Sequence, residues 1–257
     1  MKVAILAGGL GTRLGEETEI RPKPMVEIGG MPILWHIMRH YEHFGLNEFV
    51  IALGYKGNYI RRFFTEFHAN ASNLRVELRR GVSHAHGGGP EENWIVELIE
   101  TGRHTNTGGR IRRLAPYLGN ETFMLTWGDG VSNIDIPSLL QFHRSHRRLA
   151  TVTAVHPPPR FGQVVLDGPR IIEYSESPIR SAWINGAFFV LEPQVIDYIE
   201  GDDTQWEKDP MERLAKDGQL MAYRHEGFWQ CMDTIREKVL LERHWNEGRA
   251  PWKVWED

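Results

Sequence analysis

Short apolar runs alternate with amphipathic segments along this chain, and this alternation narrows the possible folds more than any other feature. The runs occupy residues 3–7, 49–53, 123–127, 150–155 and 187–191. Runs this short, bounded by polar residues and glycines, favour strands that are buried on both faces. Helical periodicity covers residues 33–44, 136–146, 193–200, 210–216 and 234–246. We therefore expect an α/β fold of three layers, α/β/α, around a mostly parallel central sheet.

The chain shows no internal repeat and no Ser-rich or Pro-rich linker. We therefore expect a single domain over residues 1–257, with a core over about 1–232 and a C-terminal helix and tail over about 233–257. Trp252 and Trp255 make this tail too aromatic for a solvated end, so we expect it to pack on the body or on another subunit.

Three further segments have a recognisable local character. Residues 164–174 contain two β-like pieces around Asp167-Gly168-Pro169, and they predict a small β hairpin inserted in the sheet. Residues 81–92, with three consecutive glycines, and residues 156–162, with three consecutive prolines, predict loops.

The balance of charge and the cysteine content exclude several classes of protein. Among 257 residues, Lys and Arg number 30 and Asp and Glu number 34, which gives a formal net charge of −4. Such a chain is a poor candidate for neutralising nucleic-acid phosphates. Cys231 is the single cysteine, so an internal disulfide is impossible. The apolar run at residues 3–7 is too short to span a membrane, and we expect a cytoplasmic protein that binds neither nucleic acid nor membrane.

A glycine-rich segment follows the first predicted strand and is the strongest chemical signal in the chain. It reads Ala7-Gly8-Gly9-Leu10-Gly11-Thr12-Arg13-Leu14. Glycines let backbone N–H groups approach an anion closely, and Arg13 adds a forked cation. The segment therefore predicts a phosphorylated ligand, and a strand-ending turn without a ligand is the alternative.

Two well-known phosphate loops do not fit this segment. A dinucleotide-binding loop needs a third glycine where Leu14 stands, and Pro22 and Pro24 would interrupt the helix that such a loop opens. A P-loop needs Gly-Lys followed by Ser or Thr, whereas two glutamates follow Gly15. The segment instead precedes Pro22-Lys23-Pro24, where the two prolines stiffen the backbone that carries the Lys23 ammonium group.

Together, the Gly-Gly-x-Gly-Thr-Arg-Leu and Pro-Lys-Pro segments resemble the signature of the sugar-1-phosphate nucleotidyltransferases. The resemblance extends over essentially the whole chain, through Gly128-Asp129, Asn185-Gly186 and a segment at 228–234 that contains Asp233. Four further segments resemble the branch of the family that transfers cytidylyl groups to glucose 1-phosphate: residues 35–38, 107–110, 160–162 and 250–253. The Gln-Pro element usual in the thymidylyl and uridylyl branches is not found in the corresponding stretch.

The resemblance implies a Rossmann-like nucleotide-diphospho-sugar transferase fold with a small β insertion and a C-terminal helical tail. It implies that an oxygen of α-D-glucose 1-phosphate attacks the α-phosphorus of CTP, giving CDP-glucose and pyrophosphate. Such a reaction needs charge neutralisation and in-line placement more than a protein nucleophile. It also implies Mg²⁺ held by Asp129 and Asp233, with Arg13 on the β and γ phosphates and Lys23 on the α phosphate as catalytic residues. We further expect a homo-oligomer.

The expected substrate contacts follow from the same resemblance. The implied nucleotide-binding residues are Leu6, Ala7, Gly8, Gly9, Leu10, Gly11, Thr12, Arg13, Lys23, Thr105, Arg110 and Gly128, with Thr105 and Arg110 at the base edge. The implied sugar-phosphate-binding residues are Glu176, Ser177, Arg180, Asn185 and Gly186. Family members generally carry Glu-Lys-Pro where this chain reads Glu176-Ser177-Pro178. Either Arg180 supplies the missing charge or the natural acceptor differs from glucose 1-phosphate.

Each assignment also has a simpler alternative. Asp129, between two glycines, fits a turn, and Asp233 fits the N-cap of the helix that follows it. Arg110 forms a basic triplet with Arg112 and Arg113, which fits a solvated helix face and makes either neighbour a competing base contact. For the whole chain, the alternatives are a weakly active regulatory or structural relative and an oxidoreductase on a dinucleotide-binding fold.

Two histidine pairs have spacings that zinc sites also use. They are His84 with His86 and His143 with His146. Neither pair has a matched third ligand nearby in the sequence, so we expect no zinc.

Overall fold

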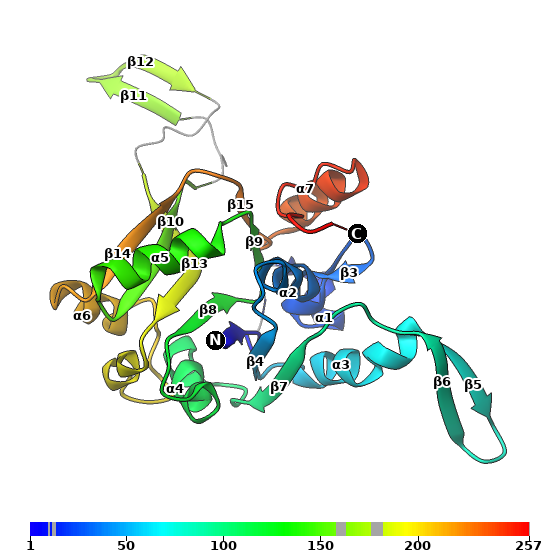
Figure 1. Ribbon diagram of the computed structural model, residues 1–257. Coiled ribbons are helices and arrows are strands. Elements are labelled where there is room, and N and C mark those ends of the chain that lie inside the picture. Colours follow the sequence, from blue (N-terminus) through cyan, green and yellow to red (C-terminus); the bar gives the residue numbers. More distant parts are fainter. Residues whose placement is uncertain (10, 12–13, 158–162, 176–181, 257) are drawn as a thin grey trace.

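A seven-stranded sheet forms the centre of the computed structural model, which describes residues 1–9, 11, 14–157, 163–175 and 182–256. In spatial order its strands are β14 (Leu220–His225), β10 (Ala150–Val155), β13 (Ile184–Leu191), β8 (Phe123–Trp127), β1 (Val3–Leu6), β4 (Glu48–Leu53) and β7 (Ile95–Glu100). β13 runs antiparallel to both of its neighbours, and every other neighbouring pair is parallel. The mostly parallel sheet predicted from the sequence is therefore confirmed (Figure 1).

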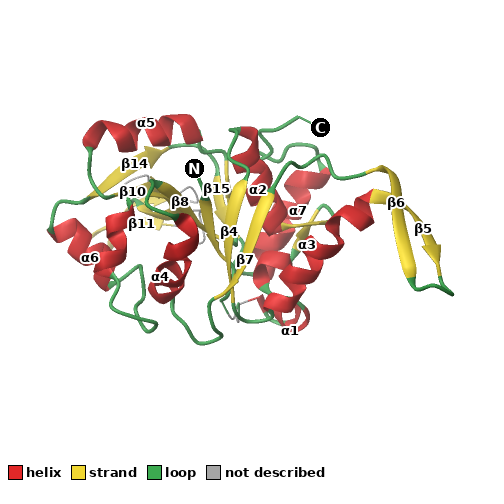
Figure 2. Ribbon diagram, turned by 60° about the horizontal axis from the view of Figure 1, so that its bottom comes forward, coloured by secondary structure: helices red, strands yellow, loops and turns green. Residues whose placement is uncertain are grey.

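Helices cover both faces of the sheet, which gives the three predicted layers. One face carries α2 (Ile33–His43), α3 (Gly57–Ala71), α5 (Ile136–His146) and α7 (Ile235–Asn246), and the other carries α4 (Thr107–Leu118), the 3₁₀ helix η3 (Pro193–Tyr198) and α6 (Asp209–Lys216). Successive residues of a strand point to opposite faces, so Val3 and Ile5 join the first core while Ala4 and Leu6 join the second. Figure 2 shows α4 and α6 on one side of the strands and α2, α3 and α7 on the other.

The five predicted strands and five predicted helices are all present, close to their expected boundaries. The segment at 193–200 differs in type, because residues Pro193–Tyr198 form a 3₁₀ helix. The sequence analysis did not predict α3, α4, β7 or β14.

Two hairpins extend from the body (Figure 1). The first pairs β5 (Ser72–Glu77) with β6 (Val82–Gly88), so the loop predicted over residues 81–92 is wrong for most of its length. Backbone pairing with β5 gives this segment its strand conformation despite its histidines and glycines. The second hairpin pairs β11 (Gln163–Asp167) with β12 (Arg170–Ser175), as predicted, but it is a separate two-stranded sheet rather than part of the central one. Most of the predicted loop at 156–162 lies outside the described residues.

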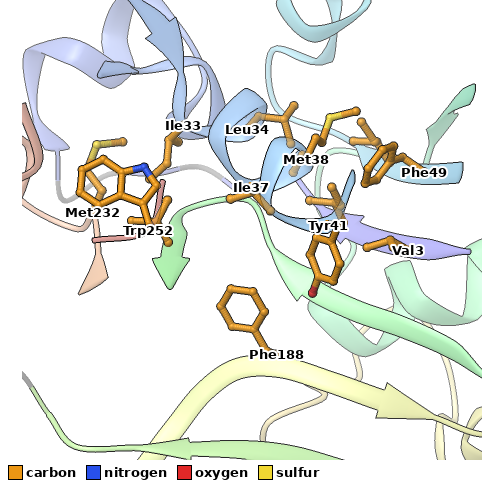
Figure 3. Close-up of a cluster of buried hydrophobic side chains, with 14 of the residues drawn as sticks. Val3, Ile33, Leu34, Ile37, Met38, Tyr41, Phe49, Phe188, Met232 and Trp252 are labelled. Atoms are coloured by element: carbon orange, nitrogen blue, oxygen red, sulfur yellow. The ribbon is translucent and has the colours of Figure 1, made fainter. Parts of the chain in front are cut away.

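The C-terminal tail packs on the body, as expected. Trp252 is fully buried, and Trp255 is 6% exposed. The indole N–H of Trp252 donates to Nδ1 of His36, and Nε2 of His36 lies 2.8 Å from the carbonyl oxygen of Ile28. Burial lowers the pKa of His36 from 6.5 to about 4, so its ring is neutral at pH 7. In Figure 3, Trp252 and Met232 form one end of the buried cluster that surrounds α2.

Short elements connect this framework near the glycine segment. They are α1 (Glu16–Ile20), the 3₁₀ turn η2 (Lys23–Met25), and two small ladders, β2 (Glu27–Ile28) with β3 (Met31–Pro32) and β9 (Gly130–Ser132) with β15 (Trp229–Cys231). Among the described residues, none of the helices has the length and apolar character needed to cross a membrane.

Candidate active site

The carboxyl ends of β1, β4 and β8 meet at one edge of the sheet because these strands are parallel neighbours. Ligands bind at such an edge in many α/β proteins. Beyond the strands, Ala7 N–H donates to the carbonyl of Ala52, and Gly128 N–H donates to the carbonyl of Leu6. The glycine segment after β1 and the Gly128-Asp129 pair after β8 therefore lie side by side.

A cavity of about 470 Å³ opens at this edge. The predicted site residues that line it are Leu6, Ala7, Gly8, Gly9, Gly11, Lys23, Thr105, Arg110, Gly128 and Asp129. Leu10, Thr12 and Arg13 belong to the same segment but lie outside the described residues. A larger open groove of about 660 Å³, between α1 and α7, has none of the predicted residues among its described lining.

Lys23 lies at the centre of the polar end of this cavity. The turn η2 begins after Pro22 and has Pro24 as its second residue, and it buries Lys23 to 8% exposure. The ammonium group donates to Oδ2 of Asp129 and to Oδ1 of Asp233, each at 2.5 Å. The structure therefore brings the three charged residues expected near the phosphates into one cluster.

The ladder of β9 and β15 brings the two aspartates together. Cys231 pairs with Gly130, and the N–H of Met232 donates to the carbonyl of Asp129 at 2.8 Å. Asp129 directly precedes β9, and Asp233 follows the last residue of β15 by two positions. Two carboxylates from distant parts of the sequence therefore flank one short pair of strands.

Asp233 is not the N-cap of α7, so the simpler alternative for this residue is wrong. The cap is Thr234, which forms a capping box with Glu237. The N–H groups of both Asp233 and Thr234 donate to the carboxylate of Glu237, at 2.6 and 2.9 Å. The Asp233 carboxylate accepts from Lys23 instead, while its backbone is fixed by the cap.

The two carboxylates of this cluster stabilise the charged form of Lys23. Burial alone would lower the pKa of Lys23, but the carboxylates of Asp129 and Asp233 outweigh it and raise the pKa above its usual value. Lys23 is therefore an ammonium ion at neutral pH. Burial, with the nearby carboxylate of Asp233, raises the pKa of the Cys231 thiol to about 12, so Cys231 remains protonated beside the site.

Arg110 is buried to 4% exposure, so it does not belong to a solvated helix face. Its guanidinium donates to the carbonyl oxygens of Leu53 and Gly8 and to the hydroxyl of Thr101. The two neighbouring arginines point elsewhere: Arg112 donates to the carbonyls of residues 199 and 200, and Arg113 forms a bidentate ion pair with Asp202. Of the three arginines, Arg110 alone lines the cavity among the described residues.

Comparison with known proteins agrees with this geometry. The sequence profile of the nucleotidyl transferases matches residues 2–257. The chain belongs to the nucleotidyl transferase family. A glucose-1-phosphate cytidylyltransferase of Salmonella typhi is 48% identical over 258 residues, with 100% of both chains covered. A probable glucose-1-phosphate cytidylyltransferase of Bacillus subtilis is 42% identical, with 99% of this chain and 100% of the relative covered. Family membership excludes the oxidoreductase alternative.

Solved structures support the same fold. HddC from Yersinia pseudotuberculosis superposes with a TM-score of 0.69 at 22% identity, covering 95% of this chain and 99% of the other. An apo UDP-glucose pyrophosphorylase superposes with a TM-score of 0.68 at 16% identity, covering 96% and 98%. At these identities the likeness concerns the architecture of the nucleotidyl transferase and not its substrates.

Nucleotidyl transferases of this family generally use a divalent metal, and the Asp129–Asp233 pair has a suitable donor set. The two side chains are 26% and 13% exposed, and both direct a carboxylate oxygen at the same cationic group. In the part of the chain that the structure describes, no cluster of three or more His, Cys, Asp or Glu side chains could hold a metal. Carboxylate oxygens are the ligands that hard divalent cations prefer.

The residues predicted to hold the sugar phosphate are described only in part. Glu176, Ser177 and Arg180 lie outside the described residues, and neither Asn185 nor Gly186 is among the residues that line the cavity. The side-chain oxygen of Asn185 accepts from the N–H of Ala187, whose φ of 59° is unusual for a residue other than glycine.

An unpredicted tryptophan links this segment to the carboxylate pair. The indole of Trp229, on β15, donates to the carbonyl of Gly186 at 2.7 Å. Since β15 leads to Asp233, the predicted sugar-binding segment is connected to the side of the nucleotidyl transferase site that carries the second carboxylate.

Sequence reasoning missed several cavity residues, namely Pro24, Arg103, His104, Asn106, Thr107 and Trp127. Pro24 and Thr107 stand inside segments already quoted from the sequence, so position within a motif was an available signal for both. The two histidine pairs lie elsewhere: His84 and His86 are on the exposed strand β6, and His143 and His146 both bond the hydroxyl of Thr151.

Proposed function

We propose that this nucleotidyl transferase is a glucose-1-phosphate cytidylyltransferase. A phosphate oxygen of α-D-glucose 1-phosphate forms a bond to the α-phosphorus of CTP, and the bond from that phosphorus to the oxygen bridging the α and β phosphates breaks. The products are CDP-glucose and pyrophosphate. Full-length relatives at 48% and 42% identity carry this activity in their names, one of them as probable, and they support the proposed substrates.

The observation that carries the proposal is the position of Lys23 between two carboxylates at one end of the glycine-lined cavity. Phosphoryl chemistry of this kind depends on positioned charge rather than on a protein nucleophile. The backbone of Gly8, Gly9 and Gly11 lines the path of the triphosphate, and Arg13 acts on the β and γ phosphates as they become pyrophosphate. Asp129 and Asp233 hold Mg²⁺, which when bound supplies charge neutralisation to the phosphates.

Lys23 has two uses in this proposal. Without substrate its ammonium compensates the two carboxylates, which would otherwise repel each other at low exposure. With CTP in the cavity it stabilises the α phosphate, the group that carries the developing charge. A short, proline-flanked turn suits both uses, because it fixes the backbone while the four-carbon stem of the side chain rotates.

At the acceptor end, Glu176, Ser177, Arg180, Asn185 and Gly186 bind the sugar phosphate. Ser177 lacks the charge that a phosphate contact usually has, so Arg180 carries that role if glucose 1-phosphate is the acceptor. Arg180→Ala should then raise KM for the sugar by about tenfold or more.

We propose further that the enzyme is cytoplasmic and a homo-oligomer. A single cysteine and exposed apolar side chains on the β5–β6 hairpin, such as Val76 and Leu78, support these two points.

The test is pyrophosphate release with CTP, UTP, dTTP, ATP and GTP, each against glucose 1-phosphate and a panel of other sugar 1-phosphates. Mass spectrometry should identify CDP-glucose as the preferred product. A weakly active regulatory relative would give no product with any pair. Equal kcat/KM for CTP and dTTP would contradict cytidylyl transfer, and strong activity with another acceptor would contradict the glucose assignment alone.

A further inference from the structure

Arg110 lines the cavity, but its guanidinium is held in a slot to which Leu53, Gly54 and Thr101, which are not among the lining residues, also contribute. Its guanidinium reaches the ends of three adjacent parallel strands: the carbonyl of Gly8 after β1, the carbonyl of Leu53 at the end of β4, and the hydroxyl of Thr101 after β7. The distances are 3.0, 3.0 and 2.6 Å. One side chain from α4 therefore joins the ends of three adjacent strands, of which the end of β1 lines the cavity.

Thr101 fixes the orientation of this guanidinium. The residue is fully buried, and its hydroxyl donates to the carbonyl of Leu53 at 2.6 Å. Since the hydroxyl proton is used in that bond, the oxygen is available as an acceptor, and Nη1 of Arg110 donates to it. Valine has nearly the same shape but would leave one guanidinium N–H buried without this acceptor.

Gly54 lies directly against the guanidinium of Arg110. A Cβ at Gly54 would lie 2.5 Å from Nη1 and 2.9 Å from Nη2 of Arg110, and 2.8 Å from the carbonyl oxygen of Gly8. The backbone of Gly54 does not have the positive φ that favours glycine, so the close approach of the guanidinium is what requires a glycine there. Gly8 approaches the same group as closely, since a Cβ built there would lie 2.2 Å from Nη1.

The hydrogen bonds inside the slot leave part of the Arg110 guanidinium available to a ligand. A guanidinium has five N–H donors and no acceptor. Three donors are used inside the protein, two from Nη1 and one from Nη2. The remaining donors belong to a side chain that lines the cavity and cannot turn without breaking buried bonds. The ring N3 of cytosine accepts a hydrogen bond, whereas the corresponding N3–H of uracil donates one. A guanidinium N–H held at N3 of the base would therefore favour cytosine over uracil.

We infer that Thr101 and Gly54 are positioning residues for base selection, which hold the Arg110 guanidinium so that CTP is preferred over UTP. The inference rests on the proposed function, because it takes CTP as the donor nucleotide. Neither residue lines the cavity, so their effect is exerted through Arg110. Loosening the slot should therefore change nucleotide selectivity more than it changes turnover or the affinity for the sugar phosphate.

The experiment compares kcat/KM for CTP and UTP in four variants of the full-length enzyme. Thr101→Val and Gly54→Ala should each lower the CTP-to-UTP ratio by about tenfold, the effect of one lost buried hydrogen bond. Thr101→Ser retains the hydroxyl and should retain the wild-type ratio. Thr151→Val is the matched control, because Thr151 is also fully buried and hydrogen-bonded but lies on β10, away from the cavity. KM for glucose 1-phosphate should stay within about twofold throughout.

The outcomes separate this inference from the proposed function. A wild-type enzyme with no preference for CTP would overturn the proposed function and the inference together. A CTP-selective wild type whose folded Thr101→Val and Gly54→Ala variants keep the wild-type ratio would overturn the inference alone. If Thr101→Val does not fold, Gly54→Ala and Thr101→Ser make the same comparison. A fall in the ratio for Thr151→Val equal to that for Thr101→Val would also overturn it, because the effect would then come from general loosening.

Discussion

Replacing Lys23 with methionine tests whether its ammonium group compensates the two carboxylates. Methionine keeps most of the apolar stem and removes the charge, so Asp129 and Asp233 would face each other with no ammonium between them. The raised pKa of Lys23 means that its stabilising charge is fully present below the usual lysine pKa and is lost as the pH rises through the raised value. At pH 7 the wild type therefore has the full contribution and the variant has none.

The expected loss of stability follows from the exposure of the three side chains. Lys23 and Asp233 are 10% and 13% exposed, whereas Asp129 is 26% exposed and is partly screened by water. Removing one partner from a fully buried ion pair costs about 3–5 kcal/mol, so we expect about 2–3 kcal/mol here. For a chain of this size, this corresponds to a decrease in Tm of about 4–12 °C.

The assay is thermal unfolding with and without Mg²⁺ at pH 7. Mg²⁺ should raise the Tm of Lys23→Met more than that of the wild type, because in the variant the ion does not compete with an ammonium group. Lys238→Met is the control: Lys238 also donates to a carboxylate at 2.5 Å, that of Glu17, but neither residue lines the cavity. Both side chains are about a quarter exposed, at 26% and 27%, so water screens this pair and we expect it to contribute at most about 1 kcal/mol. A Lys23→Met protein with the wild-type Tm and the wild-type response to Mg²⁺ would refute the compensation argument.

Three further substitutions test other parts of the structure. Asp129→Asn should lower kcat by orders of magnitude in a protein that still folds, and EDTA should do the same to the wild type; full activity would refute the metal assignment. Gly29→Ala should cost at least about 2 kcal/mol more than Gly30→Ala in urea unfolding, because both positions have positive φ but only at Gly29 would a Cβ overlap the indole of Trp245 on α7, at 1.9 Å. Between pH 6.5 and about 4, His36 is protonated in the unfolded chain but stays neutral in the folded protein. The Tm of the wild type should therefore fall as the pH is lowered through this range, and His36→Gln should reduce the slope of Tm against pH. An equal slope in both proteins would refute this last argument.

The sequence predicted the buried strands well and the elements around them less well. β1 and β8 are near-continuous apolar runs, as buried parallel strands usually are. By contrast, α4 contains Gly108, Gly109 and Pro116, which are poor helix formers. The two glycines let the loop at residues 202–204 pack directly on the helix, so tertiary contact overrides the local preference. The strand β6 is an equivalent case, because only its partner β5 makes it a strand.

The charged residues of the site were predictable, whereas the way they meet was not. Lys23, Asp129 and Asp233 stand in motifs that can be read directly from the chain. The ladder between β9 and β15 has three residues in each strand, too few to show any periodicity. The capping box could have been predicted, since Thr234 and Glu237 have the required spacing. It would have identified Thr234, and not Asp233, as the N-cap of α7. Arg110 lines the cavity, but its three internal hydrogen bonds depend on contacts that no sequence pattern records.

The pairing of β9 with β15 also has a consequence for the growing chain on a ribosome. Asp129 emerges with β8, while Asp233 emerges only after β10, β13 and β14 have been made. Contacts so distant in sequence form late, because the intervening chain must first be ordered. We therefore expect nascent chains that stop before β15 to have a complete glycine segment and one carboxylate, and to leave the Lys23 ammonium with a single partner. The cluster of Lys23 with both carboxylates would then be completed only after β15 has been made.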